Sequence, residues 1–263
     1  MQGTQLNGVL DFSGKVVLVT GGVSGIGAGI SARFLEAGAT VVACSRRTPA
    51  DLPSHAGRTV EHLGCDVRKA PECQRLIEQV VARHGRLDAL INNAGGGAEV
   101  PSAEADPALI EKIIQLNLTA AFFMSQAAYR VMHAQPEGGS IVNVSSVSAV
   151  RASPWSAAYG AAKAGLVNLT ESLAMEWGPQ RIRVNALIVG LVATPNSLAH
   201  YGGAEGVERI GQMLPLRRMG EPADVADACL YLCSPLAAYV SGAQLAVHGG
   251  GEKPVFLDLA RSS

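Results

Sequence analysis

Short apolar runs alternate with longer amphipathic stretches along almost the whole chain. Most of the short runs are apolar throughout, as strands buried on both faces of a parallel sheet are, and the longer stretches have helical spacing. The predicted strands are Lys15–Thr20, Thr40–Ser45, Leu87–Asn92, Ser140–Ser145, Arg183–Ile188 and Gln244–Val247. The predicted helices cover about residues 25–37, 71–84, 107–133, 156–177 and 222–234.

This succession of strand and helix predicts an α/β fold of the Rossmann type, with one doubly wound parallel sheet and helices on both faces. The 263 residues hold no Pro/Ser-rich linker and no repeat, so we expect a single domain over 1–263. Within it we expect an N-terminal extension at 1–12 and a C-terminal tail at 251–263. Ligands of such sheets bind beyond the carboxyl ends of the strands, where strand order reverses.

Composition favours a folded protein that binds a small molecule. Hydrophobic residues make up 48% of the chain, charged residues 16%, and the net charge is −1. Such a chain has no long-range field that would attract nucleic acid or an anionic membrane. No stretch reaches the roughly 18 uninterrupted apolar residues of a membrane helix, and the first residues lack a signal-peptide pattern. We therefore expect a cytoplasmic protein.

The five cysteines are an odd number and are scattered along the chain, so reduced thiols are expected. Cys229 and Cys233 stand four residues apart on a predicted helix, with no histidine pair near them in sequence. Core packing is favoured over half of a metal site for this pair, and no bound metal is expected.

A glycine-rich turn follows the first predicted strand. Thr20-Gly21-Gly22-Val23-Ser24-Gly25-Ile26-Gly27 leads directly into the first predicted helix. Glycines let the backbone approach a pyrophosphate, and free amides at the helix start attract its negative charge. A plain tight turn is the alternative, but strand, turn and helix occur in the order that phosphate binding requires. The candidate phosphate-binding residues are Gly21, Ser24, Gly25, Ile26 and Gly27.

The glycine spacing, T-G-x-x-x-G-I-G, resembles that of the short-chain dehydrogenase/reductase family in its short single-domain branch, and the likeness extends from about Phe12 to Gly250. Cys65-Asp66-Val67 resembles the family's adenine-contacting turn, and Asn92-Asn93-Ala94-Gly95 resembles the motif that shapes its cofactor crevice. The resemblance therefore implies cofactor contacts from Asp66, Val67, Asn93, Ala94 and Gly95.

The end of the second predicted strand bears on the choice of cofactor. Dinucleotide sites carry an acidic residue there to bind a ribose 2′-hydroxyl, or a cation to bind a 2′-phosphate. Here the strand ends in Ser45-Arg46-Arg47, and the planar guanidinium of Arg46 could pair with a phosphate. NADP(H) is therefore favoured. NAD(H) remains an alternative, because Ser24 stands where many NADP-preferring relatives have a basic residue and because the arginines could be a solvated pair.

Tyr159 and Lys163 lie four residues apart in one predicted helix, so they share a face. Ser146 follows the preceding strand, and Asn117 lies mid-helix among apolar neighbours. Together the four resemble the family's Asn-Ser-Tyr-Lys tetrad in order and spacing. Each also has an ordinary structural explanation: a packed tyrosine, a surface lysine, a capping serine and an asparagine in a helix bend.

These residue types suit hydride transfer between a nicotinamide and a carbonyl or alcohol carbon. A phenol with a pKa of about 10 exchanges protons poorly at neutral pH, but a nearby ammonium and a cationic nicotinamide both lower that pKa. We therefore expect Tyr159 to transfer the proton and Ser146 to donate a hydrogen bond to the substrate oxygen. The resemblance implies that Lys163 also holds the nicotinamide ribose and that Asn117 positions a water that links Lys163 to solvent.

The segment after the strand Arg183–Ile188 is expected to face the substrate. It carries Val189 where the family usually has proline, and the resemblance implies cofactor contacts from Gly190, Val192 and Thr194. The glycines within residues 191–214 indicate a mobile substrate lid, with an ordinary surface loop as the alternative.

Two further loops, residues 96–98 and 151–155, are expected in the pocket wall. Trp155 and Met213 indicate an apolar substrate, whereas Arg151 or His200 could bind an acid or a CoA phosphate. His248 stands where the family often has aspartate, and we interpret it as a supporting or subunit-contact residue.

Helices 107–133 and 156–177 carry small and apolar residues around much of their circumference, so we expect a homotetramer or a homodimer built on them. The leading hypothesis is a ketoreductase or hydroxy-compound dehydrogenase acting on a 3-oxoacyl thioester, a steroid-like or other apolar ketone, or a sugar. The alternative is a catalytically silent dinucleotide-binding redox sensor or scaffold, which would not need the complete tetrad.

Overall fold

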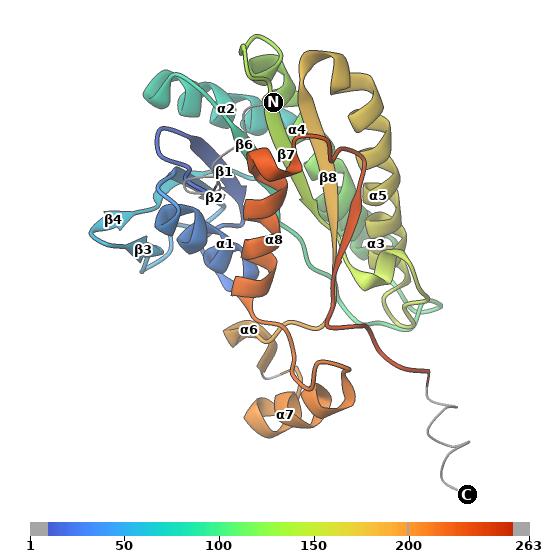
Figure 1. Cartoon of the computed structure of the whole chain (residues 1–263). Coiled ribbons are helices and arrows are strands. Elements are labelled where there is room, and N and C mark those ends of the chain that lie inside the picture. The colour runs from blue at the N-terminus through green and yellow to red at the C-terminus, as the bar shows by residue number, and fades with distance from the viewer. Residues whose placement is uncertain (1–9, 199, 255–263) are drawn as a thin grey trace, which may run out of the picture.

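The computed structural model describes residues 10–198 and 200–254. Seven parallel strands form one sheet in the order β5-β2-β1-β6-β7-β8-β9 (Figure 1). The strands are β1 Val16–Thr20, β2 Thr40–Ser45, β5 Glu61–Gly64, β6 Ala89–Asn92, β7 Gly139–Val144, β8 Ile182–Val189 and β9 Gln244–Val247. Strand order reverses between β1 and β6, and the predicted doubly wound Rossmann-type sheet is confirmed.

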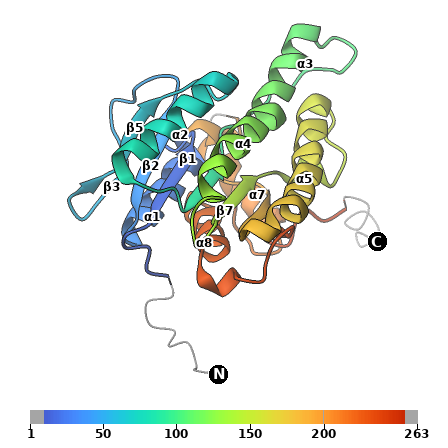
Figure 2. The same ribbon diagram turned by 90° about the horizontal axis from the view of Figure 1, so that it is seen from above.

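Helices cover both faces of the sheet. α1 and α8 pack together on one face, and α2, α4 and α5 lie along the other, as Figure 2 shows from above. The helices are α1 Gly25–Glu36, α2 Ala70–His84, α3 Pro107–Ile114, α4 Ala120–Met132, α5 Ala157–Trp177, α6 Pro195–Leu198, α7 Gly203–Met213 and α8 Pro222–Cys233. The two layers enclose two cores, one on each face of the sheet.

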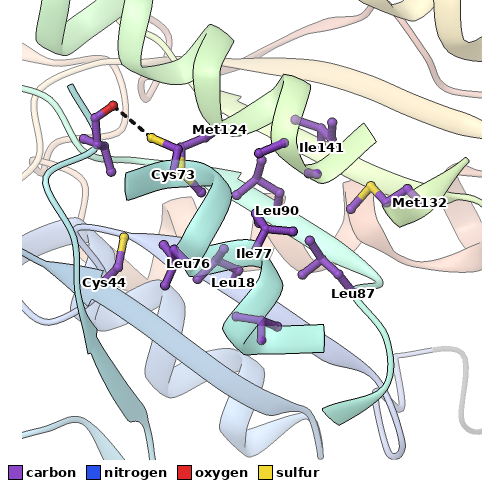
Figure 3. Close-up of a cluster of buried hydrophobic side chains, with 14 of the residues drawn as sticks. Leu18, Cys44, Cys73, Leu76, Ile77, Leu87, Leu90, Met124, Met132 and Ile141 are labelled. Carbon is purple, nitrogen blue, oxygen red and sulfur yellow. Dashed lines mark hydrogen bonds between the residues drawn. The ribbon is translucent and has the colours of Figure 1, made fainter. Parts of the chain in front are cut away.

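Alternate residues of the central strands supply the two cores. On the α2/α4 face, Leu18 and Leu90 pack with Leu76 and Met124 (Figure 3). Full burial of such a side chain stabilises the fold by about 2 kcal/mol. On the α1/α8 face Cys229 is fully buried in the second core, as predicted.

The edge of the sheet was not predicted from the sequence. β5 begins with Glu61 and His62, whose polarity hides the strand from a search for apolar runs. A small hairpin, β3 Ser54–His55 and β4 Arg58–Thr59, precedes it. Both elements are short and polar, so nothing in the hydrophobic pattern indicates them.

The predicted helix 107–133 is interrupted by the π-helical turn Gln115–Thr119 between α3 and α4. By length and composition alone, the whole run Pro107–Met132 could cross a membrane. Within this chain, 28% of its apolar 18-residue window is buried. α4 packs on α2 and the sheet, but apolar side chains such as Phe122 remain exposed. π-Turns within helices are frequent at functional sites, and this one carries Asn117.

The segment 191–214 contains α6 and α7, which extend away from the sheet in Figure 1. The sequence did not predict these helices because glycines lower the helix propensity of α7.

The predicted terminal segments lie largely outside the described residues, which exclude 1–9 and 255–263. Within the predicted extension 1–12, Phe12 is buried, with its ring edge-on to Phe34 and the centroids 5.1 Å apart. The side chain of Phe12, at the end of the predicted extension, therefore packs in the core, and the extent of the extension stays a prediction.

Candidate active site

The turn after β1 requires glycine at three of its positions. Gly21 and Gly25 have φ values of 65° and 52°, which side chains with a Cβ rarely adopt. A Cβ on Gly27 would lie 2.2 Å from the Gly21 carbonyl oxygen and 2.5 Å from Asn93 Nδ2. Within the described part of the chain, Ser24 makes no side-chain cap to α1. The backbone thus approaches closely at the positively polarised start of the helix, as an anion site requires.

Asn93 and Thr20 join this turn to the loop after β6. Asn93 Nδ2 donates to the Thr20 carbonyl oxygen at 3.0 Å, and Thr20 Oγ1 accepts from the amides of Asn93 and Ala94, each at 3.0 Å. The loops at the strand-order reversal are therefore held together by their own hydrogen bonds. Asn93 is predicted here as a cofactor contact, and its amide also fixes the turn.

A cavity of about 330 Å³ extends from this turn across the carboxyl ends of β6, β7 and β8. Its walls bring together most of the predicted site residues from five separate segments of the chain. They are Gly21, Ser24, Gly25, Ile26, Gly27, Asn93, Ala94, Gly95, Gly96, Val144, Ser145, Ser146, Tyr159, Lys163, Val189, Gly190 and Thr194.

A second cavity of about 400 Å³ lies over the ends of β1, β2 and β5 and shares Gly21, Ala94 and Gly95 with the first. The predicted residues Ser45, Arg46, Asp66 and Val67 line it. Two further cations in its wall, Arg68 and Lys112, were not predicted. Arg68 could have been found as the residue that follows Asp66-Val67, whereas Lys112 comes from a distant helix.

Asp66 is held by a two-pronged ion pair. Arg68 Nε and Nη2 donate to its two carboxylate oxygens at 2.8 and 2.6 Å, which lowers the Asp66 pKa to about 2. The Ser45 hydroxyl lies 2.9 Å from His62 Nε2 and donates to the Arg47 carbonyl oxygen. The neighbour His62 lies on β5 and was missed with that strand.

Three predicted residues do not line either cavity. Arg47 is exposed, and Val192 is buried and faces the neighbouring cavity of about 350 Å³ around His248. Asn117 is 1% exposed behind the cavity wall. Its Nδ2 donates to the Gly96 carbonyl oxygen at 2.7 Å, and its Oδ1 accepts from the Gly96 amide at 3.0 Å. The amide of Asn117 therefore fixes the loop that forms the cavity wall.

Tyr159 and Ser146 both line the first cavity. Burial raises the pKa of Tyr159 above its ordinary value, and the nearby Ser146 hydroxyl offsets only part of that rise. The Lys163 Nζ lies 5.6 Å from the Tyr159 ring centroid. Burial outweighs any lowering of the Tyr159 pKa in the chain without cofactor, so the expected lowering by Lys163 and a cationic nicotinamide stays a prediction.

Lys163 is 4% exposed, and its Nζ donates to the Val144 carbonyl oxygen at 2.8 Å. Burial lowers the pKa of the ammonium to about 8. A Cβ on Gly95 would lie 3.2 Å from that Nζ and 2.8 Å from Asn117 Oδ1. The absence of a side chain at Gly95 thus keeps Lys163 open to the cavity.

A third cavity of about 310 Å³ lies between α3 and the start of α5, with Tyr159 in its wall. Leu109, Ile110, Ile113 and Trp155 are among its mostly apolar residues. Trp155 has φ of 60°, an unfavourable value for a bulky residue, and its carbonyl oxygen accepts from the Val100 amide at 2.8 Å. Tyr159 therefore stands between the first cavity, whose lining is about half polar, and an almost wholly apolar one.

The two candidate anion-binding residues of the outer loops are both paired with carboxylates. Arg151 Nη1 lies 2.7 Å from Glu252, and His200 Nε2 lies 3.6 Å from Glu99. The expectation that either would be available to an acid or a CoA phosphate is not supported by this arrangement.

His248 packs against Gly190, where an added Cβ would lie 2.6 Å from His248 Cβ. Its Nδ1 is buried and has no hydrogen-bond partner among the described residues. The contact supports the shape of the β8 loop, and a subunit contact stays a prediction.

Comparisons with known proteins agree with this fold. A family model described as "Enoyl-(Acyl carrier protein) reductase" matches residues 21–252. Rat peroxisomal 2,4-dienoyl-CoA reductase is 33% identical over 94% of this chain and 87% of its own. The 7alpha-hydroxysteroid dehydrogenase of Escherichia coli K12 is 33% identical over 92% of this chain and 96% of its own. The structure of Thermoplasma acidophilum aldohexose dehydrogenase matches with a TM-score of 0.83 and 29% identity, over 91% and 94% of the two chains.

Fold and relatives together define the chain as an NAD(P)-dependent oxidoreductase acting at a CH–OH or C=O centre. The three relatives named here are called after a dienoyl thioester, a steroid and an aldohexose, so membership of this class does not identify the substrate. More specifically, the chain belongs to the short-chain dehydrogenase/reductase family.

Proposed function

We propose that this protein is an NADP(H)-preferring ketoreductase or hydroxy-compound dehydrogenase that acts on apolar ketones or the matching secondary alcohols. The observation that carries the proposal is the position of Tyr159, which lines both the first cavity and the apolar third cavity. A substrate whose apolar body enters between α3 and α5 would reach that phenol with its oxygen.

The first and second cavities together fit a dinucleotide. Gly27 leaves room for close backbone approach at the start of α1, and the cavities meet at Gly21, Ala94 and Gly95. Gly21, Ser24, Gly25, Ile26 and Gly27 would hold the pyrophosphate, and Asp66 and Val67 the adenine. Asn93, Ala94, Gly95, Gly190 and Thr194 would hold the nicotinamide half, whereas the predicted contact from Val192 is not supported, because this residue faces the cavity around His248. When bound, the dinucleotide supplies or accepts the hydride.

The remaining chemistry belongs to the chain. Tyr159 would give its hydroxyl proton to the substrate oxygen in reduction and take it back in oxidation. Ser146, which lines the same cavity as Tyr159, would donate a hydrogen bond to the same oxygen as negative charge develops. Lys163 would hold the nicotinamide ribose and exchange protons with Tyr159. Asn117 would support this exchange by a water beside Gly96.

The preference for NADP(H) is supported by positive charge in the second cavity. Arg46 lies next to Ser45, the position where an acidic residue would favour NAD(H), and Lys112 faces the same space. We expect a higher kcat/KM with NADPH than with NADH. A clear preference for NADH would contradict the assignment.

The third cavity supports an apolar substrate, which favours steroid-like and other apolar ketones over a sugar. The ion pairs of Arg151 and His200 disfavour a substrate with an anionic group. Neither residue is therefore available as a cation for the phosphates of a CoA thioester. The segment 191–214 would act as the substrate lid, since His200 reaches Glu99 on the opposite loop.

The deciding experiment compares wild type with Tyr159→Phe on a panel of ketones and alcohols, following NADPH absorbance. The variant should lose about 10³-fold or more in kcat with NADPH affinity nearly unchanged, because only the proton-transferring hydroxyl is removed. Tyr239→Phe, at a fully exposed tyrosine, is the matched control. Retained activity in Tyr159→Phe would refute the proton-transfer role. Tight NADPH binding without turnover in the wild type would favour the redox-sensor alternative.

The protein is further proposed to be a cytoplasmic homotetramer or homodimer. The supporting observation is the exposed apolar surface of α4 and α5, including Phe122 and Met175, next to small residues that allow close helix contact.

A further inference from the structure

Three of the five cysteines meet at the edge of the second cavity. Cys44 is near the end of β2, and Cys65 follows β5, where its amide donates to the Ser45 carbonyl oxygen at 3.1 Å. Cys73 lies in the first turns of α2, and its thiol donates to the Val67 carbonyl oxygen at 3.2 Å (Figure 3). All three side chains belong to one buried cluster, and the thiols of Cys44 and Cys73 are close enough to Cys65 to lower its pKa.

These thiols differ in access. Cys44 and Cys73 are fully buried, whereas Cys65 is 4% exposed. Cys65 and Cys44 line the cavity, and Cys73 lies behind them. Of the three cysteines, Cys65 is therefore the one that both lines the cavity and keeps some exposure.

They also differ in acidity. The S–H groups of Cys44 and Cys73 can donate to a Cys65 thiolate, which lowers the pKa of Cys65, while burial and the same interaction raise the pKa values of the other two. Because the thiolate is the nucleophile, Cys65 is the reactive member of the three.

The cavity mouth carries more positive than negative charge. Asp66 and Glu72 lie near Cys65, but each is paired with a cation, Arg68 and Lys69 respectively. Arg46 and Lys112 add two further positive charges in the wall. An anionic reagent is therefore attracted to this entrance.

We propose that Cys65 is a modification site for small anionic disulfides and related thiol-reactive compounds, and that its modification and dinucleotide binding exclude one another. The exclusion rests on the proposed function, in which the adenine half of the dinucleotide fills this cavity. The free protein is thereby sensitive to oxidising conditions, and the dinucleotide-bound protein is protected.

The chemistry is thiol–disulfide exchange. The Cys65 thiolate attacks one sulfur of the disulfide, a mixed disulfide forms, and the other half leaves as a thiolate. No net oxidant is needed beyond the disulfide itself, and a reducing thiol reverses the step. The attached group then occupies the space between Cys65 and Arg46.

The test uses three methanethiosulfonates of different charge, each of which transfers its alkylthio group to the cysteine thiolate and releases methanesulfinate. The negatively charged sulfonatoethyl reagent should react with the intact protein several-fold faster than the positively charged trimethylammonioethyl reagent, with the neutral methyl reagent as reference. Peptide mass mapping should locate the first adduct at Cys65. A first adduct elsewhere, or no adduct on the folded protein, overturns the proposal.

Protection is measured next. NADPH at ten times its dissociation constant leaves about one site in eleven free, so labelling of Cys65 should slow about tenfold. Labelled protein should bind NADPH at least tenfold more weakly until dithiothreitol removes the adduct. Calorimetry separates the two ideas: absence of NADPH binding to unlabelled protein refutes the proposed function, whereas binding without protection refutes this inference.

Variants sharpen the assignment. Cys65→Ser should lose the first adduct, while Cys229→Ser, which removes a buried thiol of α8, should label like the wild type. Arg46→Ala should slow the anionic reagent several-fold and leave the neutral reagent unchanged. An equal effect on both reagents would contradict the role assigned to charge. If Cys65→Ser does not fold, the peptide map of the wild type still decides the site.

Discussion

The buried ammonium of Lys163 shows how a site residue can reduce the stability of its own fold. It is almost fully enclosed, with the Val144 carbonyl oxygen as a hydrogen-bond acceptor, and its pKa falls from 10.5 to about 8. Since the folded protein binds this proton less tightly than the unfolded chain, stability rises with pH between about 8 and 10.5. Below pH 8 the penalty is complete and amounts to about 3 kcal/mol.

Lys163→Met should therefore be more stable than the wild type to urea at pH 7 without cofactor. The gain in the free energy of unfolding should be up to about 3 kcal/mol, reduced by the loss of the hydrogen bond to Val144. The advantage should shrink as the pH approaches 10, because the wild-type lysine then loses its proton. Lys112→Met, at an exposed lysine, is the control. A difference between Lys163→Met and wild type that does not vary with pH would contradict the pKa assignment.

Tyr159 offers a second measurement at this scale. Its pKa is raised by burial, so in the free protein its phenolate should form only above pH 10. Addition of NADP⁺ places positive charge nearby and should lower that pKa. The ultraviolet difference between wild type and Tyr159→Phe during a pH titration reports this single phenol. An unchanged titration in the presence of NADP⁺ would show that the cofactor charge does not reach it.

The order and spacing of single residues made much of this site predictable. Tyr159, Lys163 and Ser146 all line one cavity, as their sequence spacing indicated. His62 and Lys112 could not be found in this way, because their places depend on an edge strand and a distant helix that no local pattern joins to the site.

At the scale of elements, the buried strands were predictable and the irregular elements were not. β1 is apolar and buried throughout, so its pattern is clear, whereas the π-helical turn Gln115–Thr119 differs from an α-helix only in hydrogen-bond register. α7 is hidden by its glycines. The elements that escaped prediction include those that carry Asn117 and the predicted lid.

The first βα turn has no room for a single added methyl group at Gly27. Gly27→Ala would press a Cβ against the Gly21 carbonyl oxygen and Asn93 Nδ2, so the turn must shift. We expect a loss of 1–3 kcal/mol in stability, typical of overpacking, and at least a tenfold weaker affinity for NADPH. Gly178→Ala, where a Cβ meets nothing within 4 Å, is the control. Equal NADPH affinity in both variants would show that this turn does not hold the pyrophosphate.

Across the whole molecule, the apolar side chains divide between two cores and an outer face. Phe122 is 44% exposed and Met175 is 83% exposed, although α4 and α5 contribute other residues to the core. An apolar face of this kind is typical of a subunit interface.

The wild type should therefore sediment as a dimer or tetramer, and Met175→Glu should shift it toward the monomer, because a buried unpaired carboxylate opposes association. Gln79→Glu places the same charge on the exposed side of α2 and should leave the oligomer intact. A wild-type monomer at micromolar concentration would contradict the proposed assembly.

The reversal of strand order between β1 and β6 also has a consequence for how the enzyme can change. Arg46 and Ser45, which we propose to act on the choice of coenzyme, lie on the β2 side, whereas Tyr159 and Lys163, which we propose to act in proton transfer, lie beyond the ends of β7 and β8. On this proposal, coenzyme choice and the pH profile of catalysis are separable traits. Substitutions that convert one should leave the other in place, so either can evolve or be engineered alone.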